Sequence, residues 1–254
     1  MEARPELDAV QRLQEDEYAF PYHYLPQADA DGAVRQFQYW GWGYRYLAGI
    51  DFVAELVGAA PFATLADVGC GDGRMRRELG RRFPEARLCG LDFSERAVAL
   101  ARALNPGLDL RVHDVTREPL GETFDTVVLS EVLEHIPPPE LGAFVAGVAG
   151  LMHAGSRLVV TVPHANQKRH PKHYQHFTRA SLEAALVPHV RPVAWHPFDR
   201  RSRGLALWQR VLRNRFWVLN HAPTLRRVAR LHREHIHGAT ESDALRLAVV
   251  CRLG

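Results

Sequence analysis

With 254 residues, 46% of them hydrophobic, and a formal net charge of +3, the chain is long enough for one α/β domain with additions and a sizeable core. Its three cysteines, Cys70, Cys89 and Cys251, show no CxxC spacing, which argues against disulfides and a zinc knuckle and favours the reducing cytoplasm. The acidic N-terminus lacks the apolar stretch of a signal peptide, and no window approaches the ~20 apolar residues that span a bilayer. The excess of arginine over lysine is typical of a GC-rich genome rather than of nucleic-acid binding.

Residues 1–60 are expected to form an N-terminal helical and aromatic cap. A polar helix is predicted over residues 4–17, and an aromatic segment at 37–57 has helical periodicity in its later part. From residue 64 the pattern changes to short β-rich runs that alternate with helices. Strands are predicted at 64–69, 87–92, 108–114, 124–130 and 156–163, and helices at 73–83, 94–104 (with Ser94 as N-cap) and 138–152. This alternation implies a parallel sheet with helices on both faces.

A histidine-rich loop runs from residue 163 to Thr178, and a short helix and a strand near 190–198 follow it. Residues 203–236 have a helical and very basic pattern, and residues 244–253 alternate as a last strand. We therefore predict an α/β fold with a doubly wound, seven-stranded, mostly parallel, Rossmann-like sheet. The catalytic domain would span residues 61–254, with a helical insertion at about 203–238 before the last strand.

The glycine loop after the first strand is the expected ligand site of such a sheet. Its pattern is Gly69-x-Gly71-x-Gly73, and the position where a dinucleotide loop needs its last glycine holds Arg74. An acid, Asp67, precedes the loop and favours a ligand with positive charge over a pyrophosphate. The next strand ends in Asp92, which could accept both ribose hydroxyls, and the third in Asp114, which could accept from an adenine amino group. Together these residues describe an adenosine that carries a small cationic group.

Four segments in this order resemble the class I S-adenosylmethionine-dependent methyltransferases of the bacterial small-molecule type. They are DVGCGDG (67–73), GLDFS (90–94), HDV (113–115) and FDTVVLSEVLEHIPPPE (124–140); HYQHFTRASLEAAL (173–186) is similar to a segment that many members place after the fifth strand. The resemblance implies S-adenosylmethionine as cofactor. Asp67 and the loop would hold its methionine part, Asp92 and Phe93 its ribose, and Asp114 and Val115 its adenine; the loop residues are Gly69, Cys70, Gly71 and Gly73.

The resemblance also suggests roles for two further parts of the chain. Ser130 and Glu131 would line the methyl-transfer end of the site. The aromatic segment before the first strand is similar to one that covers the cofactor in many bacterial members, where Arg45 could meet the methionine carboxylate. Packing of these aromatic side chains on the sheet is an equal alternative.

Histidines and acids form a second candidate constellation at the ends of strands four and five. His135, His173 or His176 could be a general base for an acceptor hydroxyl. Alternatively, Glu131, Glu134, His135 and a later histidine could bind a divalent metal, as their spacing resembles that of small-RNA 3′-end ribose methyltransferases and of ubiquinone-pathway O-methyltransferases. Hydrogen bonds that only fix the loop are the third interpretation. We predict a metal-free site whose catalytic candidates are His135, His173, His176 and Glu131.

Residues 200–233 contain ten arginines and no acid, interleaved with apolar residues. They could form a solvated face, a gate for an anionic substrate or a weak membrane-surface contact, and we favour the solvated face. The predicted function is methyl transfer to a small-molecule hydroxyl in secondary metabolism or glycan biosynthesis. RNA or tRNA methylation, cyclisation of the cofactor's aminobutyrate chain and a cofactor-binding regulator are the alternatives; no nucleic-acid partner is expected, and a homodimer is left open.

Overall fold

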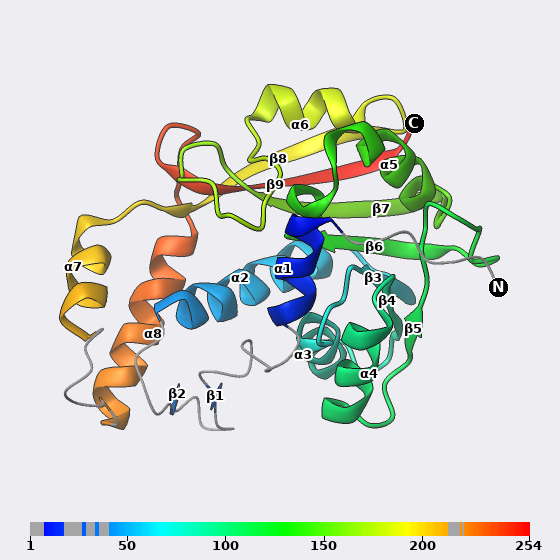
Figure 1. The fold of residues 1–254 in the computed structure, drawn as a ribbon. Helices are drawn as coiled ribbons and strands as arrows, with labels where there is room; N and C mark the ends of the chain where they lie inside the picture. Colours follow the sequence, from blue (N-terminus) through cyan, green and yellow to red (C-terminus); the bar gives the residue numbers. More distant parts are fainter. Residues whose placement is uncertain (1–7, 18–26, 29–33, 36–40, 213–218, 220) are drawn as a thin grey trace.

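The computed structural model describes residues 8–17, 27–28, 34–35, 41–212, 219 and 221–254. Seven strands form one sheet in the order β5-β4-β3-β6-β7-β9-β8, with helices on both faces (Figure 1). All neighbouring strands pair in parallel except that β9 is antiparallel to β7 and β8. The strands are β3 (Thr64–Val68), β4 (Arg87–Asp92), β5 (Leu110–Val112), β6 (Phe124–Ser130), β7 (Met152–Pro163), β8 (Val190–Arg200) and β9 (Ala244–Leu253). The predicted seven-stranded, mostly parallel sheet is confirmed.

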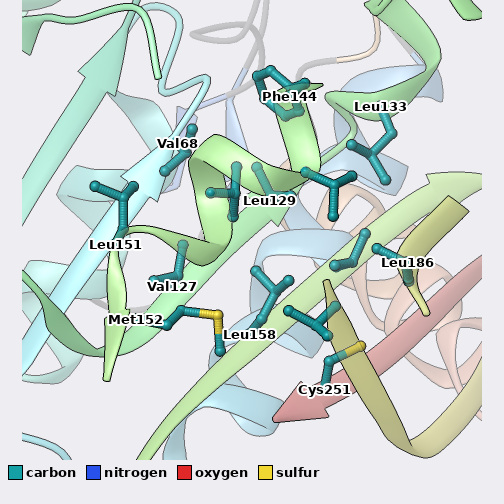
Figure 2. Close-up of a cluster of buried hydrophobic side chains, with 14 of the residues drawn as sticks. Val68, Val127, Leu129, Leu133, Phe144, Leu151, Met152, Leu158, Leu186 and Cys251 are labelled. Atoms are coloured by element: carbon teal, nitrogen blue, oxygen red, sulfur yellow. The ribbon is translucent and has the colours of Figure 1, made fainter. Parts of the chain in front are cut away.

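Successive residues of the central strands point into two different cores, as the period of two requires. In β6, Val127 and Leu129 join one cluster of buried side chains, whereas Val128 joins another. Figure 2 shows the first cluster, in which Leu129 lies near Phe144 of helix α5 (Leu141–Ala149). Helices α2 (Gly41–Gly58) and α3 (Arg74–Arg82) contribute to the second cluster. Burial on both faces explains why the strands are nearly continuous apolar runs in the sequence.

Local capping places the two helices that flank the candidate site. Helix α4 (Glu95–Leu104) begins at the predicted N-cap, where the Ser94 hydroxyl accepts a hydrogen bond from the Ala97 amide at 3.1 Å. Helix α6 (Arg179–Leu186) begins at Thr178 with a capping box that Ser181 completes. Helix α4 begins where the sequence predicts, whereas α6 begins at Arg179, two residues before the predicted start at Ser181.

Some element boundaries differ from the prediction. Residues 138–140 form a 3-10 turn, η3 (Pro138–Glu140), and the α-helix begins only at Leu141. Three consecutive prolines lack the amide hydrogens of a regular helix, and each disfavours the α conformation in the residue before it. Strand β7 begins at Met152, which pairs with Phe124, although residue 152 was assigned to the preceding helix. Strand β5 is shorter than predicted.

The remaining elements either precede the first strand of the sheet or lie between its last two strands in the sequence. Helix α1 (Ala9–Glu17) and the two-residue strands β1 (Gln27–Ala28) and β2 (Val34–Arg35) precede α2. Helices α7 (Arg203–Leu212) and α8 (Ala222–Ile236) lie between β8 and β9, where an insertion was predicted, and α8 packs against α2. Residues 4–7 and 37–40 of the predicted N-terminal helices lie outside the described residues, and the boundary between cap and catalytic domain stays a prediction. None of the helices that the structure describes has the length and apolar character needed to cross a membrane.

Candidate active site

The glycine loop lies at the edge of the sheet where the parallel strands end. Gly69, Gly71 and Gly73 have positive φ angles of 73°, 53° and 78°, a backbone conformation that is strained for other residues. At Gly69 a Cβ would also lie 2.6 Å from Cγ2 of Val132. Cys70 is buried between them, and burial raises the pKa of its thiol, which favours a packing role. The loop therefore requires its glycines for its own conformation, independently of any ligand.

Asp92, at the end of β4, holds the glycine loop in place. Its Oδ2 accepts a hydrogen bond from the Gly71 amide and its Oδ1 accepts one from the Ser94 amide, both at 2.9 Å. Phe93, the next residue, leaves 51% of its surface exposed, although the strand before it is buried. A buried carboxylate followed by an exposed aromatic ring suits a ligand that combines hydroxyl groups with a flat apolar ring.

Asp67, which precedes the loop, fits the cationic part of the expected cofactor. Its side chain is 2% exposed, and Oδ2 has no hydrogen-bond partner among the described residues. Burial raises the pKa of this carboxyl to about 7, although the nearby Arg76 favours the ionised form. A buried carboxylate oxygen without a partner is unfavourable unless a ligand supplies positive charge or a donor. The residues at this edge therefore fit S-adenosylmethionine.

Asp114, the predicted acceptor of the adenine amino group, interacts in the structure with residues that follow it closely in the sequence. Its Oδ1 accepts hydrogen bonds from the amide and the hydroxyl of Thr116, at 2.9 and 2.6 Å, and Oδ2 lies 3.1 Å from Nε of Arg117. Val115 is buried beside helix α5, where its carbonyl lies against Gly147. His113 is buried too, with Nε2 unpartnered within the described chain, and sequence reasoning gave it no role. The adenine contacts stay a prediction.

Arg45, the predicted partner of the methionine carboxylate, forms an ion pair in which its Nε lies 2.9 Å from Oδ2 of Asp199. The same oxygen lies 3.2 Å from Nε of Arg246, so one buried carboxylate holds two arginines from α2 and β9. Sequence reasoning missed Asp199 and Arg246. The one available signal was a charged residue within the apolar alternation of the last strand. Contact between Arg45 and the cofactor stays a prediction.

Glu131 follows β6 in a left-handed conformation, with φ of 57°, that is strained for a residue with a side chain. Its Oε1 accepts a hydrogen bond from the Thr161 hydroxyl at 3.0 Å, and the hydroxyls of Thr161 and Ser130 lie 3.1 Å apart. Burial raises the pKa of Glu131, while Arg246 favours its ionised form. Strand β7 therefore fixes the predicted methyl-transfer residues Ser130 and Glu131 through Thr161.

Glu134 lies one 3-10 turn further on, in η2 (Leu133–His135), and is 1% exposed. Its Oε2 has no hydrogen-bond partner among the residues that the structure describes. Burial raises the pKa of Glu134 well above its ordinary value, and the neighbouring Glu131 adds to this effect. The negative charge of one carboxylate thus favours the protonated form of the other, or a nearby cation.

The hydrogen bonds of the histidines define their tautomers. Nδ1 of His135 lies 3.1 Å from the Lys172 carbonyl, and Nδ1 of His176 lies 3.2 Å from the Gln167 carbonyl, so each Nδ1 carries a proton and donates. His176 Nε2 is therefore an acceptor, and Nδ1 of His173, at 2.9 Å, donates to it. Nε2 of His135 and Nε2 of His173 consequently present lone pairs.

The protonation of these rings follows from their burial. Burial lowers the pKa of His135 to about 4 and of His173 to about 2, and it also lowers the pKa of His176. The rings of His135 and His173 meet edge to face, with centroids 4.8 Å apart, and His170 lies 5.4 Å from His173. All three candidate bases are neutral at pH 7, and the predicted meeting of the strand-four and strand-five residues is confirmed.

Three of these residues could also hold a metal ion. One ligand atom each from Glu134, His135 and His173 lies within 4.8 Å of the others, and among the described residues this is the group with metal-binding geometry. Neutral imidazole lone pairs and a carboxylate are ligands that divalent transition metals accept. The absence of a metal stays a prediction. Of the other loop histidines, His164 accepts a hydrogen bond from the Asn166 amide at 2.9 Å and stabilises the loop.

Comparisons with known proteins agree with this geometry. Residues 65–155 match a family model described as a methyltransferase domain. The chain is 31% identical over 172 residues to ubiquinone biosynthesis O-methyltransferase of Alkalilimnicola ehrlichii, covering 63% of this chain and 64% of that protein. It is 30% identical over 169 residues to the protein of the same name from Hahella chejuensis, covering 63% and 66%. The matches thus span slightly less than two thirds of these relatives.

A solved structure with a similar fold is the N-methyltransferase NodS of Bradyrhizobium japonicum with S-adenosyl-L-homocysteine. Its TM-score is 0.59 at 14% sequence identity, covering 97% of this chain and 99% of that chain. At this identity the likeness concerns the fold alone.

Proposed function

We propose that the chain is a class I S-adenosylmethionine-dependent methyltransferase that transfers a methyl group from this cofactor to a hydroxyl group of a small molecule; the matching methyltransferase-domain model over residues 65–155 and the similar O-methyltransferases support this. One observation carries the proposal. A cofactor loop held by Asp92 lies at the same sheet edge as neutral histidines with lone pairs on Nε2 and a buried pair of carboxylates. The name of the relatives, O-methyltransferase, supports a hydroxyl acceptor, and we place the reaction in secondary metabolism or glycan biosynthesis.

The cofactor supplies an activated methyl group on a sulfonium, which leaves positioning and exclusion of water to the protein. Asp92, which accepts a hydrogen bond from the Gly71 amide, would also accept hydrogen bonds from the ribose hydroxyls. Asp67 would balance the positive charge of the methionine part. Thr161 orients Glu131 at the end of β6, on the side where the acceptor would enter.

A hydroxyl acceptor must also lose its proton. His135 and His173 present Nε2 lone pairs whose orientation is fixed by the hydrogen bonds at the opposite ring nitrogens. His176 would stabilise a protonated His173, because its Nε2 accepts a hydrogen bond from Nδ1 of His173 while its own Nδ1 donates one to the Gln167 carbonyl. Glu134 lies 3.9 Å from Nε2 of His135 and could stabilise positive charge there. In this proposal His135 or His173 would act as the general base, and their hydrogen-bond partners would hold the ring in place.

A metal-assisted form of the same reaction is the second candidate, and the grouping of Glu134, His135 and His173 favours it. These residues would hold the ion, which would polarise the acceptor hydroxyl and lower its pKa. The low pKa values of His135 and His173 also favour this form, because a good base has a pKa nearer the working pH.

The proposal is tested by incubating the protein with methyl-labelled cofactor and either fractionated small molecules rich in phenol and sugar hydroxyls or total RNA. We expect label in an alkali-stable ether of a small molecule. Label in RNA would contradict the proposal. Calorimetric binding of S-adenosylhomocysteine without transfer to any fraction would instead favour a regulator or a reaction other than methylation.

A further inference from the structure

Helix α7 exposes apolar side chains next to arginines. Leu207 is 63% exposed and Trp208 is 44% exposed, which is unusual for large neighbouring apolar residues on a helix. Leu207 follows Arg203 by four residues and precedes Arg210 by three, so the three side chains share one helix face. Both arginines are exposed. The outer face of α7 is therefore apolar in its centre and positively charged on its flank.

Helix α7 is held at its C-terminal end. Leu212, at the end of the helix, is 4% exposed and packs with Leu225 and Val228 of α8. Tyr44 of α2 belongs to the same cluster. The exposed face is therefore the side of an anchored helix, and Figure 1 shows α7 projecting from the sheet on the side of α8.

The charge of the chain is strongly segregated toward this region. Residues 141–233 contain 16 arginines and lysines but only two acids, Glu183 and Asp199. Residues 1–140 contain 14 basic residues and 24 acids. Behind the net charge of +3 there is thus a strongly basic segment, residues 141–233, that would be attracted to an anionic surface.

From these observations we propose that α7 binds an anionic lipid surface. Leu207 and Trp208 would enter the headgroup region, where an aromatic ring is favoured, and Arg203 and Arg210 would pair with lipid phosphates. A second copy of the chain fits less well, because a two-fold interface would bring these arginines against their own copies. A nucleic acid would leave Leu207 and Trp208 without a suitable partner.

Helix α7 follows closely on a residue that contacts the histidine-rich loop. Arg201, two residues before α7, donates a hydrogen bond from Nη2 to the Asn166 carbonyl at 2.5 Å, and Asn166 belongs to the histidine-rich loop. If the proposed function holds, the acceptor is then a hydroxyl compound held in or on the membrane. The lipid contact itself does not depend on that function.

The test is co-sedimentation of the full chain with vesicles, at about 0.1 M salt. We expect binding to vesicles that contain phosphatidylglycerol and little binding to pure phosphatidylcholine. Arg203→Gln/Arg210→Gln should lower the partition coefficient about thirtyfold, since each arginine near an anionic surface contributes roughly fivefold. Leu207→Ser/Trp208→Ser should lower it about tenfold or more.

Two matched variants serve as controls. Arg96→Gln/Arg191→Gln removes two exposed arginines elsewhere, and Val187→Ser/Val193→Ser replaces two exposed apolar residues (56% and 45% exposed) outside α7. Both should bind vesicles as the wild type does. Calorimetry with S-adenosylhomocysteine, without vesicles, shows that each variant is folded and separates this proposal from the proposed function.

Three outcomes would overturn the proposal. The first is no binding to phosphatidylglycerol vesicles by the folded wild type. The second is binding that Leu207→Ser/Trp208→Ser leaves unchanged, which would indicate adsorption by charge alone. The third is a dimer, seen by light scattering, that this double variant dissociates while the wild type does not bind vesicles.

Discussion

Asp92→Ala removes the one side chain that is expected to serve the cofactor and the loop at the same time. Both carboxylate oxygens accept backbone hydrogen bonds, from Gly71 and Ser94, and a carboxylate oxygen can accept more than one hydrogen bond, as binding of a ribose hydroxyl would require. The substitution therefore has two separable effects. It leaves two buried amides without acceptors, which destabilises the fold, and it removes two acceptors of the ligand.

The expected loss of cofactor affinity follows from these bonds. A hydrogen bond to a charged group contributes ~1.5–3 kcal/mol. Water can partly replace the carboxylate in the variant, so the loss of both hydrogen bonds to the ribose should lower the binding free energy by about 2–4 kcal/mol. This corresponds to a Kd for S-adenosylhomocysteine that rises about 30-fold to about 700-fold. Isothermal titration calorimetry measures it, at a temperature well below the unfolding midpoint of the variant.

Asp125→Ala is the matched control for the loss of stability. Asp125 also accepts two backbone hydrogen bonds, from the Ala63 and Thr64 amides at 2.8 Å, but it lies at the start of β6, at the opposite edge of the sheet. It should lose stability without losing cofactor affinity. If folded Asp92→Ala binds S-adenosylhomocysteine as tightly as the wild type, the ribose lies elsewhere and the assignment of this edge is wrong.

Four further outcomes test the site. Gly71→Val should abolish S-adenosylhomocysteine binding in titration calorimetry, because φ at this position is 53° and the side chain would enter the cofactor's space; unchanged affinity of a folded variant would contradict this. Since Asp67 has a pKa of about 7 without ligand and a cationic group favours its ionised form, affinity should rise as pH increases toward 7, and Asp67→Asn should flatten that dependence. His135→Ala or His173→Ala should lower turnover ~10²–10⁴-fold with cofactor affinity nearly unchanged, and activity should survive a chelator; chelator inhibition that magnesium or zinc reverses would overturn the metal-free prediction. Glu131→Gly and Glu131→Ala should both abolish transfer, but the glycine variant should have the higher free energy of unfolding by about 1 kcal/mol, because only alanine keeps the strain of the left-handed backbone; equal stability of the two variants would contradict the strain.

The sheet could be predicted from the sequence because its strands carry local signals. Strands β4, β6 and β9 have the predicted bounds, since each is an apolar run between turn residues or acids. The failures concern interactions that a single segment does not encode. The start of β7 at Met152 depends on pairing with Phe124, and no propensity within the segment reveals that register.

The glycine loop shows a second limit of sequence reasoning. Its glycines were interpreted as making room for a ligand, and the structure supplies a different requirement, because all three have left-handed backbone and Gly69 also lies against Val132. The glycines are thus explained by the loop's own conformation, and its contact with a ligand stays a prediction. The ligand is better indicated by Asp67, whose Oδ2 has no partner in the described part of the chain.

The least predictable part of the site is the group around Glu131. Among the described residues, Glu131 and Asp199 are the two non-glycine residues with positive φ, and they end two different strands, β6 and β8. Arg246 joins them, since it pairs with Asp199 and favours the ionised form of Glu131. Each left-handed residue costs roughly 1–2 kcal/mol, and such strain persists only where surrounding contacts hold it. At Glu131 and Asp199 the fold therefore accepts backbone strain to hold two carboxylates in the field of Arg246, as we expect if this end of the sheet is the active site.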